Sequence, residues 1–239
     1  MISGGGGEVR GLGVADRYRR VLDQVAEAAL RVGRSPDEIT VVAVSKGVDD
    51  ERIREAVAAG VRVLGENRVQ EALKKRERLA DLGVSWHLVG HLQTNKVKYA
   101  VKFFDLIHSL DSVRLAREIQ KRAEGHGPVA VLVEVNLTGQ ASRFGVREEE
   151  LRPLLEEVAT LPLVRVEGLM TIAPVVERME EARPCFRRLY ELAQKVREWG
   201  IPGIRMRELS MGMSADFPVA VEEGATMIRV GTAIFGPRT

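Results

Sequence analysis

A lysine closes a run of apolar residues near the start of the chain. Residues 39–45 read Ile-Thr-Val-Val-Ala-Val-Ser, and Lys46 follows them directly. The run is rich in β-branched residues and has no polar alternation before its last residue, which is typical of a parallel strand covered on both faces. An amine held against such a core has a destabilised ammonium form, and a neutral amine condenses with an aldehyde. The pattern therefore indicates a Schiff-base lysine; a lysine that only ends the strand and reaches solvent is the alternative.

Two later segments carry groups that bind phosphate. Residues 210–216, Ser-Met-Gly-Met-Ser-Ala-Asp, contain hydroxyls at Ser210 and Ser214, and Gly212 lets the backbone approach an anion before a predicted helix begins. Residues 229–232, Arg-Val-Gly-Thr, add a cation, a second glycine and a further hydroxyl. The two segments together predict a phosphate site.

Each segment alone also has a structural explanation. Ser214 could be the N-cap of the last helix, with Asp216 complementing the helix dipole, and Gly231 could serve only a turn. If the first and last strands are neighbours in a closed barrel, both segments face Lys46. A ligand that carries a phosphate and an aldehyde explains this arrangement better than two separate structural roles. Pyridoxal 5′-phosphate (PLP) is such a ligand, and we expect it as the cofactor.

Arg229 is expected at the pyridine nitrogen of that cofactor, because it ends the last predicted strand two residues before Gly231. Arginine does not give up its proton, and a neighbouring cation disfavours protonation of the pyridine. The ring would then be a weak electron sink. The alternative for Arg229 is an ion pair with Glu222 or Glu223.

Eight strands that alternate with helices are predicted to position these residues. The predicted strands are 39–45, 61–65, 85–90, 105–109, 130–136, 165–170, 205–210 and 226–230, and the predicted helical segments are 15–32, 50–59, 68–82, 113–124, 148–160, 177–199 and 214–222. Eight such units favour an α/β fold that closes into a single (β/α)8 TIM barrel with an extra N-terminal helix, and an open doubly wound sheet is the alternative. The polar residues follow the strands, at the end where barrels place their sites.

Length and composition agree with one domain and exclude several classes of protein. The chain has 239 residues, 45% of them hydrophobic, and we expect a disordered glycine-rich segment at 1–12 and a barrel domain at 13–239. Its 36 basic and 34 acidic residues are interspersed, so nucleic-acid binding is not indicated. No apolar stretch approaches the roughly 18 to 20 residues that span a bilayer, so we expect no membrane segment and a cytoplasmic location. The single cysteine, Cys185, is expected to be a small buried apolar residue.

A histidine pair gives only a weak metal signal. His87 and His91 have the i, i+4 spacing of a helical zinc pair, but strand-like residues and a glycine lie between them, so we expect no metal. The segment that begins at His91 is expected to cap a helix at Thr94 and to orient a loop over the cofactor. Lys96 and Lys98 could hold a transient second PLP or an acidic partner, with a solvated helix face as the alternative.

Six motifs carry a family resemblance. They are 43–46 (Ala-Val-Ser-Lys), 65–71 (Gly-Glu-Asn-Arg-Val-Gln-Glu), 86–96 (Trp-His-Leu-Val-Gly-His-Leu-Gln-Thr-Asn-Lys), 168–171 (Gly-Leu-Met-Thr), 209–216 (Leu-Ser-Met-Gly-Met-Ser-Ala-Asp) and 229–236 (Arg-Val-Gly-Thr-Ala-Ile-Phe-Gly). From about residue 39 to residue 236 the chain resembles the pyridoxal phosphate homeostasis protein family. This family looks like the barrel domain of alanine racemase and of eukaryotic-type ornithine decarboxylase, standing alone.

The resemblance assigns roles to residues of the predicted site. Lys46 matches the Schiff-base lysine, Arg229 the arginine at the pyridine nitrogen, and Asn67 a residue close to the cofactor. The phosphate-binding positions that match are Ser210, Ser214, Gly231 and Thr232, and Met211 and Gly212 complete the expected cofactor-binding set. Two departures are Thr94, where serine is common, and Gly47, where threonine often follows the lysine.

The second acid/base group of a racemase is missing from the predicted site. In alanine racemase this group is a tyrosine from a separate β-domain of the partner subunit, whereas Tyr18, Tyr99 and Tyr190 fall in helical segments where packing is expected. The resemblance therefore implies a PLP-binding protein of intracellular PLP homeostasis, which stores, delivers or buffers PLP for apo PLP-dependent enzymes. We expect a monomer or weak dimer and assign no catalytic residue. The alternatives are a PLP-dependent, racemase-like enzyme and an interaction module in which the site reports ligand state.

Overall fold

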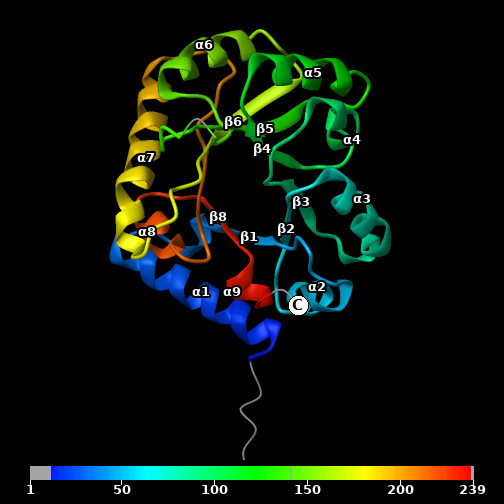
Figure 1. Ribbon diagram of the computed structural model, residues 1–239, viewed down its shortest axis with the longest axis vertical. Coiled ribbons are helices and arrows are strands. Elements are labelled where there is room, and N and C mark those ends of the chain that lie inside the picture. The colour runs from blue at the N-terminus through cyan, green and yellow to red at the C-terminus, as the bar shows by residue number, and fades with distance from the viewer. Residues whose placement is uncertain (1–11, 141, 238–239) are drawn as a thin grey trace, which may run out of the picture.

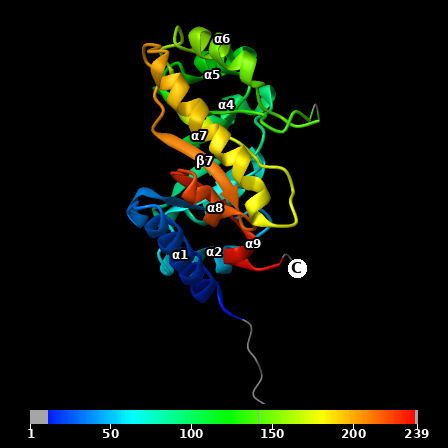
Figure 2. The same ribbon diagram turned by 90° about the vertical axis from the view of Figure 1, so that its left-hand side faces the viewer.

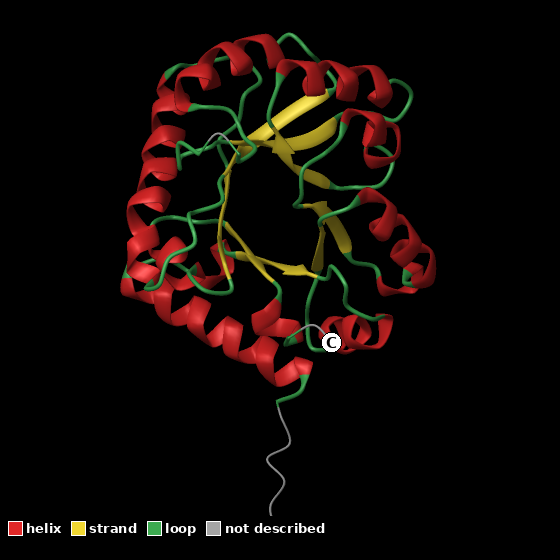
Figure 3. Cartoon of the chain, viewed as in Figure 1, coloured by secondary structure: helices red, strands yellow, loops and turns green. Residues whose placement is uncertain are grey.

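Parallel strands close into a barrel in the order of the sequence, and helices surround it (Figures 1 and 3). The computed structural model describes residues 12–140 and 142–237, so of the segment 1–12, predicted to be disordered, only Leu12 lies within the described residues. The strands are β1 (Thr40–Val44), β2 (Val63–Glu66), β3 (Ser85–Leu88), β4 (Leu106–Leu110), β5 (Val129–Glu134), β6 (Val164–Met170), β7 (Glu208–Met213) and β8 (Met227–Val230). Because β8 pairs with β1, the predicted TIM barrel is confirmed and the open sheet is excluded.

Helices cover the outside of the barrel in the described ranges. They are α1 (Val14–Arg31), α2 (Asp50–Ala58), α3 (Val69–Arg78), α4 (Val97–Ala100), α5 (Val113–Ala123), α6 (Glu148–Val158), α7 (Arg183–Glu198), α8 (Phe217–Glu222) and α9 (Thr232–Phe235), with 3-10 turns η1 (Pro36–Glu38), η2 (Ala80–Leu82), η3 (Thr94–Lys96) and η4 (Met179–Ala182). Within this part of the chain, none of the helices combines the length and the apolar character needed to cross a membrane.

Two apolar clusters lie on opposite sides of the strands. Val42 of β1, Leu132 of β5 and Met227 of β8 belong to an inner cluster that fills the barrel. Val41 and Ala43, on the other face of β1, belong to a much larger cluster shared with the helices. This alternation follows from the period of two along a strand. Both faces of the sheet are therefore buried, as the apolar run before Lys46 predicted.

The extra helix α1 is an amphipathic element that packs on the barrel wall. Its buried residues recur at helical spacing, and they are Val14, Tyr18, Val21, Val25, Ala28 and Ala29. The helix contacts α2, α8 and α9, so it joins the first units of the barrel to the last (Figures 1 and 2). The predicted N-terminal helix is thus confirmed.

Several predicted boundaries were wrong, most consequentially around β7. This strand starts three residues later than predicted and runs to Met213, with a register shift between Ser210 and Met213 in its pairing with β8. The helix between β7 and β8, α8, starts at Phe217 after an N-cap at Asp216, so Ser214 is not its N-cap. The short helix α9 was not predicted, since four residues are too few to show a helical period, and α4 was expected only as a helix capped at Thr94.

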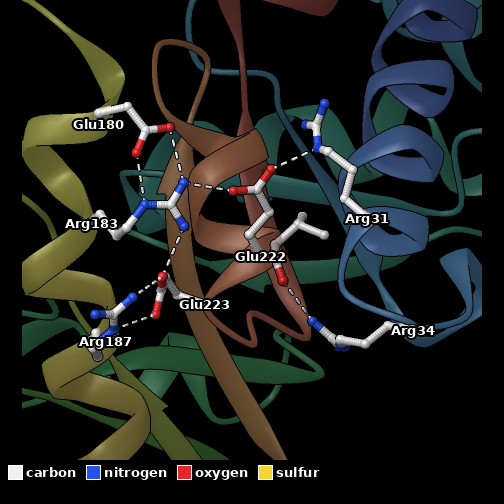
Figure 4. Close-up of polar contacts among 8 residues, drawn as sticks. Arg31, Arg34, Glu180, Arg183, Arg187, Glu222 and Glu223 are labelled. Atoms are coloured by element: carbon white, nitrogen blue, oxygen red, sulfur yellow. Dashed lines mark hydrogen bonds and ion pairs between the residues drawn. The ribbon is translucent and has the colours of Figure 1, made fainter.

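An ion-pair cluster joins α1, α7 and α8 (Figure 4). Arg183 contacts Glu222 at 2.6 Å and Glu223 at 2.8 Å, and its side chain is only 26% exposed. Glu222 also binds Arg31, and Glu223 binds Arg187. Both acidic partners proposed for Arg229 are therefore engaged by other arginines, and that alternative for Arg229 is wrong.

The first prediction concerns this cluster. Arg183→Met should lower the free energy of unfolding by about 1–2 kcal/mol, because it leaves two largely buried carboxylates, those of Glu222 and Glu223, with fewer partners. The matched control is Arg178→Met, whose ion pair with Glu181 is on an arginine that is 83% exposed, and it should cost no more than about 0.5 kcal/mol. Urea unfolding of both variants measures the difference, and equal costs would contradict a structural role for the cluster.

Candidate functional site

A cavity of about 320 Å3 lies at the carboxyl ends of β1, β2, β7 and β8. Six residues of the predicted cofactor-binding set line it: Lys46, Asn67, Ser214, Arg229, Gly231 and Thr232. Apolar side chains, among them Val44, Val89, Ile172 and Phe235, form the rest of the wall. The structure thus brings together residues from both ends of the chain in a mostly apolar recess with a few polar groups, which is the usual make-up of a small-molecule site.

Lys46 lies in a tight turn two residues beyond β1. The turn is closed by the Val48 N–H, which donates to the Ser45 carbonyl at 3.0 Å. Gly47 takes a φ of +69°, a conformation that costs glycine little and strains β-branched residues. Gly47, which departs from the family pattern, therefore suits the conformation of this turn. The side chain of Lys46 is half-buried and reaches the cavity.

Arg229 is held inside the barrel by a buried chain of hydrogen bonds. Its guanidinium donates to Ser210 Oγ at 2.6 Å and to the Thr171 carbonyl at 2.8 Å. Ser210 Oγ lies 2.9 Å from His108 Nδ1, and His108 Nε2 lies 3.1 Å from His87 Nδ1. One proton arrangement satisfies the chain: Ser210 accepts from Arg229 and donates to His108, which donates to His87.

Burial sets the charges along this chain. It lowers the pKa of His87 to about 4 and holds the pKa of His108 well below its usual range, so both rings are neutral at neutral pH. Burial also lowers the pKa of Arg229 to about 10, which still leaves the guanidinium protonated at pH 7. The guanidinium of Arg229 is therefore a fixed cation inside the barrel, and it lines the cavity.

The two predicted phosphate segments meet at Ser214. Its hydroxyl accepts hydrogen bonds from the N–H groups of Gly231 and Ala233, both at 3.3 Å. Gly231 also passes close to β1, since a Cβ at this position would lie 3.3 Å from the Val44 carbonyl oxygen. Backbone donors and two hydroxyls, those of Ser214 and Thr232, are thus gathered on one side of the cavity, where an anion would find several partners.

Three members of the predicted set lie away from the cavity wall. Ser210 is fully buried and holds Arg229, and Met211 packs in the outer apolar cluster. Gly212 allows β7 to approach α8, because a Cβ there would lie 2.5 Å from the Cβ of Ala220. Their direct contact with a cofactor stays a prediction, while the structure gives each a supporting role.

Asn67, one residue beyond β2, packs against Gly90, which lies in the segment that follows β3. A Cβ at Gly90 would lie 2.4 Å from the Asn67 carbonyl oxygen, closer than any side chain permits. Gly90, which lies between His87 and His91, therefore leaves room for the backbone of Asn67.

The histidine pair itself does not converge on one point. His87 contacts His108 inside the barrel, whereas the His91 ring stacks on Phe144 with centroids 3.8 Å apart and its Nδ1 lies 3.2 Å from Asp111. The helix cap predicted at Thr94 is wrong. Gln93 precedes η3 without a side-chain cap, and the Thr94 hydroxyl accepts from Arg114.

Cys185, Lys98 and the three tyrosines lie outside the cavity lining. Cys185 is only partly buried, less than predicted, although it packs against the outer cluster. Lys98 lies over the ring of Tyr99, 4.8 Å from its centroid, on the helix that borders the rim. The three tyrosines lie in α1, α4 and α7, in the outer ring of helices as predicted.

Glu134 is a titratable residue that the sequence reasoning missed. It ends β5, is 6% exposed and lines a second cavity of about 240 Å3, which shares Ile172 with the first. Burial and the nearby carboxyl of Asp111 raise the pKa of Glu134 to about 7, with Arg229 opposing them. The available signal was an acidic residue directly after the apolar run Val129–Val133. A carboxyl that titrates near neutrality therefore lies within electrostatic reach of Arg229.

Comparison with known proteins identifies the class and then the family. Residues 22–239 match the family model of the alanine racemase N-terminal domain, which is the class of domain that the barrel and its rim site define. Within this class the chain belongs to the pyridoxal phosphate homeostasis protein family. It is 48% identical over 229 residues to the protein of that name from Aquifex aeolicus, covering 95% of this chain and 99% of the relative, and 40% identical over 227 residues to that from Pseudomonas aeruginosa, covering 94% and 96%.

Solved structures agree with this placement. The structure of PipY from Synechococcus elongatus with PLP bound has a TM-score of 0.82 and 41% identity, and covers 93% of this chain and 100% of PipY. Alanine racemase of Clostridium difficile has a TM-score of 0.71 at 16% identity, and the match covers 92% of this chain and 56% of the racemase. The racemase thus shares the barrel fold.

The second prediction concerns the pH dependence of stability. Because the pKa of Glu134 in the folded protein lies above its ordinary value of 4.5, folding favours the protonated form, and stability is lost as pH rises from about 4.5 to about 7. Glu134→Gln mimics the protonated carboxyl. In the ligand-free protein it should therefore be about 2–3 kcal/mol more stabilising at pH 8 than at pH 5.

Urea unfolding at the two pH values measures this difference. The control is Glu150→Gln, because the backbone N–H and side chain of Arg147 lower the pKa of this exposed carboxyl. Its effect should run in the opposite direction or be too small to see. A Glu134→Gln effect that is the same at pH 5 and pH 8 would show that Glu134 is not held neutral by the fold.

Proposed function

We propose that this chain binds PLP and takes part in PLP homeostasis inside the cell, storing, delivering or buffering the cofactor with little or no turnover. The observation that carries the proposal is a single cavity lined by the amine of Lys46, the cation of Arg229, and the hydroxyls of Ser214 and Thr232. Membership of the family and the similarity to PipY, solved with PLP bound, support it.

The donor set fits the chemistry of PLP. When bound, PLP supplies an aldehyde that forms a carbon–nitrogen bond with a neutral lysine amine and releases water. Lys46 is the lysine that lines the cavity, and we assign it this role. A phosphate dianion needs several donors at once, which the hydroxyls of Ser214 and Thr232 and the nearby backbone N–H groups supply. The apolar wall accommodates the ring.

The position and charge of Arg229 favour a protein that stores or carries PLP over a PLP-dependent enzyme. Its guanidinium stays protonated at neutral pH and is fixed by Ser210 and Thr171. A fixed cation beside the pyridine nitrogen disfavours protonation of that nitrogen, and an unprotonated ring withdraws electrons weakly. Removal of an α-proton from a bound amino acid would therefore be slow. We further propose that the protein acts in the cytoplasm as a monomer or weak dimer and passes PLP to apo PLP-dependent enzymes.

A PLP-dependent, racemase-like enzyme is the second candidate, because one observation favours it. Glu134 titrates near neutrality, as a general acid or base should, and lies within electrostatic reach of Arg229. The tyrosines offer no such group at the cavity, since Tyr18, Tyr99 and Tyr190 belong to the outer helices. The two candidates differ in whether bound amino acids lose their α-proton.

The third prediction tests the site of attachment. Borohydride reduction of the protein incubated with PLP, followed by peptide mapping, should label Lys46. Lys46→Ala should abolish the label yet unfold cooperatively like the wild type, because Lys46 lies in a turn outside the apolar core. Lys96→Ala and Lys98→Ala are the controls at the rim and should keep the label. Labelling confined to Lys96 or Lys98 would refute the assignment.

The fourth prediction separates the two candidate functions. PLP-loaded protein should restore activity to an apo PLP-dependent enzyme, whereas exchange of the α-hydrogen of alanine in D2O, followed by NMR, should be slow compared with a racemase. Fast exchange that Lys46→Ala abolishes would overturn the proposal and establish the enzyme, and its loss in Glu134→Gln would identify the acid/base group. If neither transfer nor exchange occurs, the interaction module is the remaining function.

A further inference from the structure

A second buried polar cluster lies behind the turn that carries Lys46. Glu66, the last residue of β2, is fully buried, and Lys75 of α3 is 4% exposed. Their charged groups meet at 2.7 Å, and Lys75 Nζ also contacts Glu71 Oε1 at 3.0 Å. The three residues, which we call the α3 cluster, contain two carboxylates and one ammonium group.

The α3 cluster contacts both neighbours of Lys46. On one side, the Ser45 hydroxyl donates to Glu66 Oε1 at 2.6 Å, and Lys75 Nζ donates to the Ser45 carbonyl. On the other side, the Gly47 N–H donates to Glu71 Oε1 at 2.7 Å. The residue before Lys46 and the residue after it are therefore held by the same set of charges.

The cluster lies on the opposite side of the barrel wall from the cavity. Leu64, two residues before Glu66 and on the same face of β2, belongs to the outer apolar cluster, and Lys75 comes from a helix outside the barrel. Lys46 lines the cavity, whereas Glu66, Glu71 and Lys75 are not among its lining residues. The α3 cluster can therefore act on a ligand only indirectly, and its contacts on both sides of Lys46 make the position of that lysine the most direct route.

Stability alone does not explain charges at this position. Taking an ion pair out of water costs free energy that its attraction often fails to recover, and apolar residues of similar size commonly serve a core as well. Here Glu66 Oε2 is buried and accepts no hydrogen bond from the described residues, which adds to that cost. What the charges provide and apolar side chains would not is a set of directional contacts to the backbone on either side of Lys46.

We propose that Glu66, Glu71 and Lys75 are positioning residues, which fix the turn from Ser45 to Gly47 and so set where the amine of Lys46 lies in the cavity. The inference rests on the proposed function, since it concerns the reach of Lys46 toward an aldehyde. None of the three residues touches the ligand, so their loss should impair bond formation at Lys46 and leave the rest of the cavity able to bind.

The experiment compares two ligands. PLP has the aldehyde and is trapped on Lys46 by borohydride, whereas pyridoxine 5′-phosphate has an alcohol in its place and binds only non-covalently. Lys75→Met and Glu71→Ala should slow trapping at Lys46 by about tenfold or more, because a small misplacement of a reacting group has effects of this size. Their dissociation constants for pyridoxine 5′-phosphate should stay within about twofold of the wild type, well under the tenfold that 1.4 kcal/mol represents.

Matched variants separate positioning from folding. Lys74→Met makes the same substitution at an exposed neighbour on α3 and should trap PLP like the wild type. Glu71→Gln keeps an oxygen that can accept from the Gly47 N–H and should restore most of the trapping rate. Glu71 is partly exposed, so Glu71→Ala should remain folded even if Lys75→Met does not, and urea unfolding checks both.

Three outcomes decide against the inference. Trapping at the wild-type rate in Glu71→Ala and in folded Lys75→Met overturns it, and so does a parallel loss of affinity for pyridoxine 5′-phosphate, which would make the cluster a general structural support. If the wild-type protein neither traps PLP nor binds pyridoxine 5′-phosphate, the proposed function fails and this inference falls with it, a result distinct from failure of the variants alone.

Discussion

The pairing of β8 with β1 is the contact on which the site depends. Its register places Arg229 opposite Val42 and Val230 opposite Ala43, so the segment that continues into Gly231 runs beside the strand that leads to Lys46. In an open sheet with the same strand order, these two strands would be opposite edges. Closure of the barrel therefore converts two distant segments into adjacent walls of one cavity, and the helices matter to the site chiefly because they make closure stable.

Two polar networks hold the walls of this cavity from opposite sides of the sheet. The inner chain, from His87 to Arg229, fixes a cation inside the barrel, and the outer α3 cluster grips the turn around Lys46. Both networks place charged or polar groups where burial is unfavourable for them, as the lowered pKa of His87 and the raised pKa of Glu66 indicate. These buried polar groups therefore lower the stability of the fold but fix the positions of Arg229 and Lys46, as is common at functional sites.

Strands and helices with a clear local period could be predicted from the sequence, whereas contacts between residues far apart in the chain could not. The buried strand before Lys46 and the long helix α1 have clear periods, and the order of strands and helices was enough to predict the barrel. The end of β7 was misplaced because a register shift near Gly212 breaks the alternation of faces. Ser210 has a hydroxyl suited to phosphate, but its partner His108 lies on another strand, and no spacing along the chain relates the two residues.

The seam between β1 and β8 also bears on when the site comes into existence during synthesis. A chain is made from its N-terminus, so Lys46 emerges early, whereas Arg229, Gly231 and Thr232 are added much later. Until β8 takes its place, the early amine has neither the cation nor the phosphate-side donors beside it. Occupancy of the cavity is therefore a sign that the entire barrel has been made and closed, and a ligand bound there stabilises the finished fold over every shorter intermediate.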